Sequence, residues 1–86
     1  MAADTFGLLA APSRLQIVWL LSGGELDVGT LAVLVGGSVQ AVSQHLAKLK
    51  AAGLVRARRQ GRHQLYRVDN KTIAAVVRQV IEGSAP

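Results

Sequence analysis

The sequence contains no cysteine, few aromatic residues and no long apolar run. Without cysteine the chain forms no disulfide, thiolate metal site or cysteine nucleophile. Phe6, Trp19 and Tyr66 are its only aromatic residues, and no apolar run approaches the ~20 residues that a bilayer-spanning helix needs. The N-terminal residues also lack the cationic start of a secretory signal. We therefore expect a cytoplasmic protein that does not bind membranes.

Groups arranged for catalysis are missing as well. No pair of carboxylates and no Ser–His arrangement has a third group to support it, so the sequence does not predict an enzyme. The glycine pairs at 23–24 and 36–37 lack the spacing of a phosphate-binding loop and indicate turns. With 86 residues the chain is expected to form a single domain over residues 1–86, and a domain of this size buries only ~60% of its unfolded surface. Size alone therefore favours a homo-oligomer.

Acidic residues are absent between Ser38 and Val68, although this segment contains seven cations. The flanks do not share the excess, because residues 1–37 hold one cation and three acids, and residues 69–86 hold two of each. A local positive surface is typical of proteins that bind the phosphate backbone of nucleic acids. The seven cations are Lys48, Lys50, Arg56, Arg58, Arg59, Arg62 and Arg67.

The spacing of apolar residues predicts three helices in the first half of the chain. Pro12 separates a short helix at about 6–11 from an almost entirely apolar helix at 13–21. A helix that is apolar nearly all round is buried on more than one side. Asp27 is the expected N-cap of a third helix, which ends at Gly36–Gly37.

The second half begins with a helix and then changes period. Ser38 is the expected N-cap of a helix at about 38–52, which forms a helix-turn-helix with the helix before it. From 54 to 68 the period is two, with a turn at Gln60–Gly61, so the pattern predicts a β-hairpin. A final helix at about 70–82 carries an apolar stripe that requires a partner.

The exposed side of the helix at 38–52 suits the major groove of DNA. Gln40 and Gln44 carry amides that match the donor and acceptor of adenine. Cations, in contrast, bind the phosphates of the DNA backbone and do not distinguish one base sequence from another. Taken singly, each of these side chains more often belongs to a solvated face; their combination predicts binding of double-stranded DNA. The predicted contacts are Ser38, Gln40, Ala41, Ser43, Gln44, His45 and Lys48 in the helix, and Arg58, Arg59, Arg62 and His63 in the hairpin.

Five stretches of the chain match a known pattern: Leu9–Ile17, Glu25–Val28, Ala41–Leu49, Ala52–Val55 and Arg58–Arg62. Together they resemble the ArsR/SmtB family of bacterial winged-helix repressors, over about residues 8–81. The resemblance implies a mainly α fold with a β-hairpin wing, in the order α-α-α-α-β-β-α, with the recognition helix at 38–52 and the wing tip at 58–63. It also implies a homodimer, formed through the first and last helices, that binds a palindromic operator in the bacterial nucleoid. The implied interface residues are Phe6, Leu8, Leu9, Ile73, Val76, Val77, Val80 and Ile81.

The metal sites of that family have no counterpart in this sequence. Metal-sensing members often carry two cysteines in a Glu-Leu-Cys-Val-Cys pattern, where this chain has Asp27 and Gly29. A second family site in the last helix uses acid and histidine ligands, and the corresponding stretch here offers Asp69, Asn70 and Thr72. We therefore predict no metal site and no cofactor.

The signal that such a regulator senses is left open. His45 and His63 are the only histidines and lie in the predicted DNA-facing region, away from a buried sensor site. A small molecule between the dimer helices or a separate sensor protein is favoured. One alternative is a regulator that holds a divalent metal such as nickel or zinc at a non-standard site, and another is a winged-helix interaction module without operator binding. Gly37 replaces a larger apolar residue common in this turn, which predicts looser packing between the two helices.

Overall fold

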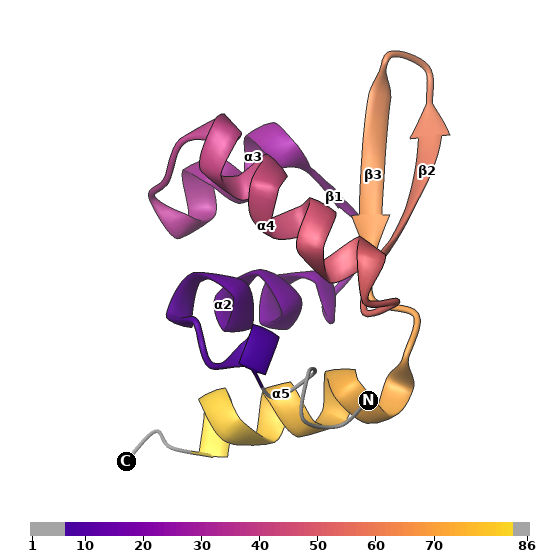
Figure 1. Ribbon diagram of the computed structural model, residues 1–86. Coiled ribbons are helices and arrows are strands. Elements are labelled where there is room, and N and C mark those ends of the chain that lie inside the picture. Colours follow the sequence, from indigo (N-terminus) through magenta and orange to yellow (C-terminus); the bar gives the residue numbers. More distant parts are fainter. Residues whose placement is uncertain (1–6, 84–86) are drawn as a thin grey trace.

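The computed structural model describes residues 7–83 of the chain, and residues 7–9 form a helical turn that leads into the first complete helix (Figure 1). The fold is mainly helical with one β-hairpin, which confirms the winged helix-turn-helix architecture expected from the sequence. The apolar helix α2 is central, with α3 and α4 packed on one side of it and α5 on the other (Figure 1). The elements are α2 (Pro12–Leu21), β1 (Leu26–Asp27), α3 (Val28–Val35), α4 (Val39–Ala51), β2 (Arg56–Gln60), β3 (His63–Arg67) and α5 (Lys71–Gly83).

Side chains at the helix starts accept the first free backbone N–H groups. Asp27 Oδ1 accepts from Thr30 N at 2.8 Å and Ser38 Oγ accepts from Ala41 N at 3.1 Å, so both predicted N-caps are confirmed. Gly36 ends α3 in the left-handed conformation, with φ 74° and ψ 29°, which a residue with a side chain adopts only at a cost. Capping and this glycine together fix where the helix-turn-helix bends.

The sheet has one more strand than the sequence predicted. The two residues of β1 pair with β3, so the strand order is β1-β3-β2 and all neighbours are antiparallel. In β2 and β3, Gln60 pairs with His63, so the turn consists of Gly61 and Arg62 and not of Gln60–Gly61 as expected. Gly61 has φ 61°, which fits a type II′ turn, where glycine takes the first central position. A two-residue strand has no visible period, which is why the pattern missed it.

The core contains only apolar side chains within residues 7–83. It joins α2 to every other helix, and burying each large aliphatic side chain contributes roughly 1.5–3 kcal/mol. Trp19 Nε1 also donates a hydrogen bond to Glu82 Oε2 at 2.8 Å, which ties α2 to α5. None of the helices within residues 7–83 has the length and apolar character of a membrane-spanning segment. The largest fully buried side chains are Ile17, Val18, Leu31, Val42, Leu46, Leu49, Val55 and Val77.

Candidate nucleic-acid interface

Helix α4 presents an exposed face of short polar and small side chains. Its buried stripe of Val42, Leu46 and Leu49 faces the core, so the turn of ~100° per residue places Gln40 and Gln44 on the solvent side. Residues 28–47 contain no Asp, Glu, Lys or Arg, so no formal charge competes with the amides for partners there. The predicted contacts Ala41, Ser43 and Lys48 are exposed as well, and the Ser38 hydroxyl is engaged in the helix cap.

His45 lies on the flank of α4 and not on its outer face. The ring is half-buried, and its Nδ1 lies 3.5 Å from Nη1 of Arg14 on α2, whose Nε donates to the Leu8 carbonyl oxygen at 2.8 Å. Burial lowers the pKa of His45 below its usual value, and the nearby charges of Arg14 and Lys48 lower it further. A neutral imidazole that faces Arg14 is placed to hold α2 and α4 together.

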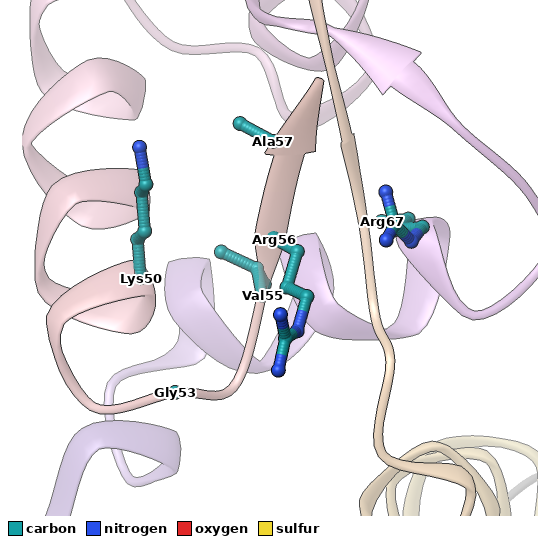
Figure 2. A pocket seen from close by; sticks show the side chains of 6 residues that line it. All are labelled: Lys50, Gly53, Val55, Arg56, Ala57 and Arg67. Carbon is teal, nitrogen blue, oxygen red and sulfur yellow. The ribbon is translucent and has the colours of Figure 1, made fainter.

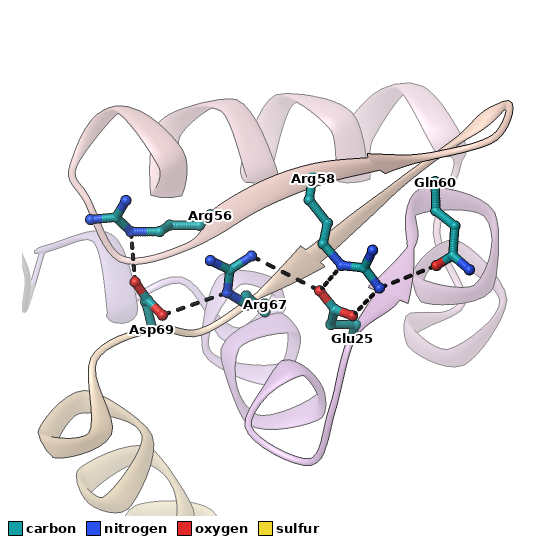
Figure 3. Close-up of polar contacts among 6 residues, drawn as sticks. All are labelled: Glu25, Arg56, Arg58, Gln60, Arg67 and Asp69. Carbon is teal, nitrogen blue, oxygen red and sulfur yellow. Dashed lines mark hydrogen bonds and ion pairs between the residues drawn. The ribbon is translucent and has the colours of Figure 1, made fainter.

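An ion pair links the hairpin to the segment that precedes β1. Arg58 Nε donates to Glu25 Oε2 at 2.7 Å and Arg58 Nη2 donates to Glu25 Oε1 at 2.8 Å, a bidentate contact (Figure 3). The hydrogen bond from Arg58 lowers the pKa of Glu25, with further contributions from the charges of Arg58 and Arg67, and it raises the pKa of Arg58. Glu25 is therefore ionised and engaged at neutral pH.

Two more carboxylates pair with cations of the hairpin region. Asp69 lies 2.7 Å from Arg56 Nε and 3.5 Å from Arg67 Nε, and Asp27 Oδ2 lies 3.5 Å from His63 Nδ1 (Figure 3 shows the first two contacts). The segment without acids in the sequence therefore meets acids in space. Sequence reasoning missed this because the acids come from residues before Ser38 and after Val68, and only the pairing of β1 with β3 brings Glu25 and Asp27 to the hairpin.

The other side of β2 faces α4 across an open cavity. Ala57 and Val55 point towards the side of Lys50, whereas Arg56 and Arg67 extend away from it (Figure 2). The cavity has a volume of about 400 Å³, and its lining combines small and apolar residues with cationic ones. Its lining residues are Lys50, Gly53, Val55, Arg56, Ala57 and Arg67.

The predicted dimer residues divide into exposed and buried members. On α5, Val76 and Val80 are 44% and 53% exposed, whereas Val77 is 1% exposed and belongs to the chain's own core. Leu8, Leu9, Ile73 and Ile81 are half-buried against that core, and Phe6 lies outside the described residues. A small apolar groove of about 180 Å³ runs along this surface, lined by Leu9, Ala10, Leu15, Val76, Val77 and Val80.

The described part of the chain holds no group of three or more His, Cys, Asp or Glu side chains close enough to bind a metal ion. Asp27 and the two histidines are the strongest candidates for metal ligands, but each already has another contact. Asp27 is engaged by Thr30 N and His63, and His45 faces the cation of Arg14.

Known proteins share both the sequence and the fold. Residues 11–57 match the family described as bacterial regulatory protein, arsR family. The HTH-type transcriptional regulator KmtR of Mycobacterium tuberculosis is 42% identical over 90% of this chain and 59% of its own length. The chain spans 29% of a second relative, the HTH-type transcriptional regulator Rv0324 of the same organism.

Solved structures agree with this relationship. The transcriptional regulator HlyU of Vibrio vulnificus superposes with a TM-score of 0.87 at 31% identity, covering 98% of this chain and 88% of its own. A homodimeric winged helix-turn-helix DNA-binding domain of Mycobacterium bovis gives a TM-score of 0.84 at 36% identity, covering 96% of this chain and 77% of its own. The architecture is therefore that of a winged helix-turn-helix protein. The chain belongs to the arsR family, a family of regulatory proteins and not of enzymes.

Proposed function

We propose that this chain is a homodimeric, sequence-specific DNA-binding regulator of transcription that acts as a repressor on a palindromic operator. The observation that carries the proposal is the outer face of α4, where Gln40 and Gln44 stand exposed and uncharged beside Lys48, which has no ion-pair partner within residues 7–83. A helix of this kind fits the major groove, and paired amides match the edge of adenine. The whole chain acts as one domain in this proposal.

The apolar surface of α5 supports the homodimer. Val76 and Val80 are exposed beside Leu9 and Leu15, and a second copy of the same surface would cover them. The structural neighbour from Mycobacterium bovis is described as homodimeric. A two-fold axis through this surface would set two α4 helices about one DNA turn apart, ~34 Å, which explains the choice of a palindrome.

Control of this regulator is proposed to come from outside the two metal sites of the family. Asp27 occupies the place of a family thiolate and caps α3, and the start of α5 uses Asn70 Oδ1 as its own cap at 3.0 Å from Ile73 N. A small molecule between the dimer helices or a separate sensor protein would then carry the signal. Calorimetric titration of the chain with Ni²⁺ and Zn²⁺ tests this, and binding of either ion at a defined stoichiometry would replace the proposal with a metal-responsive regulator.

The DNA-binding function is tested with a palindromic duplex recovered by in vitro selection and a scrambled duplex of the same composition. Both should bind at low salt, and the affinity for each should fall steeply as salt rises, because bound cations displace counterions from DNA. The selected duplex should bind more tightly at every salt concentration. Absence of binding to both duplexes at low salt would leave a winged-helix interaction module and refute the regulator.

A further inference from the structure

The cations of the hairpin region are divided between two environments. Side chains of a strand alternate between faces, so Arg56 and Arg58 share one face of β2, and Ala57 and Arg59 share the other. In the strand register Arg67 lies opposite Arg56, and Glu25 precedes Leu26, which pairs with Tyr66 beside Arg67. One face of the sheet therefore collects two of the three arginines of β2, the arginine of β3, Asp27 of β1 and Glu25 just before β1.

This face, which we call the outer face, is electrically balanced. Its three arginines, Arg56, Arg58 and Arg67, pair with the carboxylates of Glu25 and Asp69. A third carboxylate on this face, Asp27, lies against His63. The contacts form a chain along the sheet, in which Glu25 joins two of the arginines and Asp69 joins two (Figure 3). A DNA backbone that approached this face would meet the carboxylates together with the arginines, so little net attraction would result.

The face of β2 towards α4 is different. Ala57 points towards Lys50 across the cavity of Figure 2, and alternation places Arg59 on the same side. Arg59, Arg62 in the turn, Lys48 and Lys50 have no ion-pair partner within residues 7–83, and Arg59 contacts only the Gly61 carbonyl oxygen, at 3.4 Å. Two cations of α4 and two of the hairpin are therefore not neutralised by an acid within residues 7–83.

We propose that Glu25 is a positioning residue that fixes the hairpin through Arg58 and Arg67, and that only the cations on the α4 side and in the turn bind phosphate. The proposal rests on the DNA-binding function proposed above. It divides the cations of the protein between two roles, positioning of the hairpin and binding of phosphate. A two-stranded hairpin is marginal on its own, so a bidentate contact from Glu25, the residue just before the third strand, is an effective way to hold its angle to α4. Released from Glu25, the hairpin would still carry its charge but would lose its fixed direction.

The test compares neighbours that undergo the same change of charge. Arg59→Gln and Arg58→Gln are measured on the selected and the scrambled duplex over a range of salt. Arg59→Gln should weaken binding to both duplexes and reduce the slope of log affinity against log salt by ~0.9 for each protomer. Arg58→Gln should leave the slope of the wild-type protein unchanged. Equal flattening by the two variants would show that the ion pair opens on DNA, and it would overturn the division by face.

Glu25→Gln tests the positioning role directly. The ratio of affinities for the selected and scrambled duplexes should fall severalfold, while the affinity for the scrambled duplex is maintained or rises because a carboxylate is removed. The double variant with Arg58→Gln should lose no more selectivity than either single variant, because both changes break one contact. An unchanged ratio in Glu25→Gln refutes the positioning role. If this variant does not fold, the Arg58 and Arg59 comparison decides the proposal, and a wild-type chain that binds neither duplex refutes the DNA-binding function instead.

Discussion

The molecule has one end formed by α4 and the hairpin and another formed by α5. The two ends differ in how far apart in the sequence the residues lie that determine their surfaces. At the hairpin end the surface is charged, and residues distant in the sequence decide which cations are available: Glu25 engages Arg58, 33 positions away. At the α5 end the surface is apolar, and its exposed large side chains, Val76 and Val80, come from one helix. The number of cations in a sequence segment therefore overestimates the positive charge that is left unpaired on the folded surface. An apolar surface on one helix, in contrast, can be identified from the local spacing of its residues.

The two ends should also differ in how strongly a substitution changes the stability of the fold. The hairpin contacts are exposed ion pairs, and such pairs contribute little to the stability of the folded state. They fix geometry more than they stabilise the fold. The α5 contacts include buried Val77, whose loss affects the fold itself. Substitutions at the hairpin end should therefore change DNA binding, whereas substitution of the buried residue on α5 should change the stability of the fold.

The largest effect is expected from Val77→Asp. The side chain is 1% exposed in the core, and an unpaired buried carboxylate costs at least ~3 kcal/mol, a large share of the stability of a small domain. We expect the variant to lose its cooperative thermal transition, followed by circular dichroism. Ala75→Asp, an exposed position on the same helix, should keep that transition. A folded Val77→Asp protein would show that α5 is not part of the core.

These two ends show how far the sequence predicts the structure. Helix caps at Asp27 and Ser38 were predicted because the side chain and its backbone partner lie three residues apart. The stripe on α5 was predicted as well, but spacing does not tell Val77, which faces its own chain, from Val80, which faces outward. The ion pairs of the outer face were not predictable, since they depend on the pairing of β1, a strand of two residues.

The next effect concerns the apolar end alone. Val80 is 53% exposed, so Val80→Asp should leave the monomer folded and place a charge in the proposed dimer surface, where it lacks a partner. Sedimentation equilibrium should show monomers at concentrations at which the wild-type chain is dimeric. Ala75→Asp serves as the control with the same added charge. Dimers of unchanged affinity in Val80→Asp would move the interface away from α5.

A moderate effect is expected at the charged end from Gln44→Ala. Loss of a base-reading amide should weaken binding to the selected duplex by ~1–3 kcal/mol and relax the preference at one base pair. The scrambled duplex should bind as before, because no charge changes. Gln79→Ala, an exposed glutamine on α5, provides the control. Equal weakening on both duplexes would contradict the role of Gln44 in reading bases.

A smaller effect is expected in the turn between α3 and α4. A Cβ at Gly37 would lie 3.6 Å from Val35 Cγ2 and 3.9 Å from Val42 Cγ2, which are ordinary packing distances, and its φ lies outside the left-handed region. Gly37→Ala should therefore stabilise the fold by ~0.4–1 kcal/mol in denaturant unfolding, through lower entropy of the unfolded chain and tighter packing. Gly36→Ala should destabilise it, because φ is 74° there. A loss of stability in Gly37→Ala would contradict the looser packing predicted for this turn.

The smallest effect concerns the contact between α2 and α4 at His45. Burial and the charges of Arg14 and Lys48 lower the pKa of His45 in the folded protein, so the unfolded chain binds a proton more readily than the folded one. Stability that is fully present above the ordinary pKa of about 6.5 should therefore decrease as pH falls through that value towards the folded pKa. Thermal unfolding between pH 7.5 and 5.5, roughly the range around that pKa, should show this decrease, and His45→Gln should flatten it. An equal decrease in the variant would assign the effect to another group and remove His45 from the contact between α2 and the recognition helix.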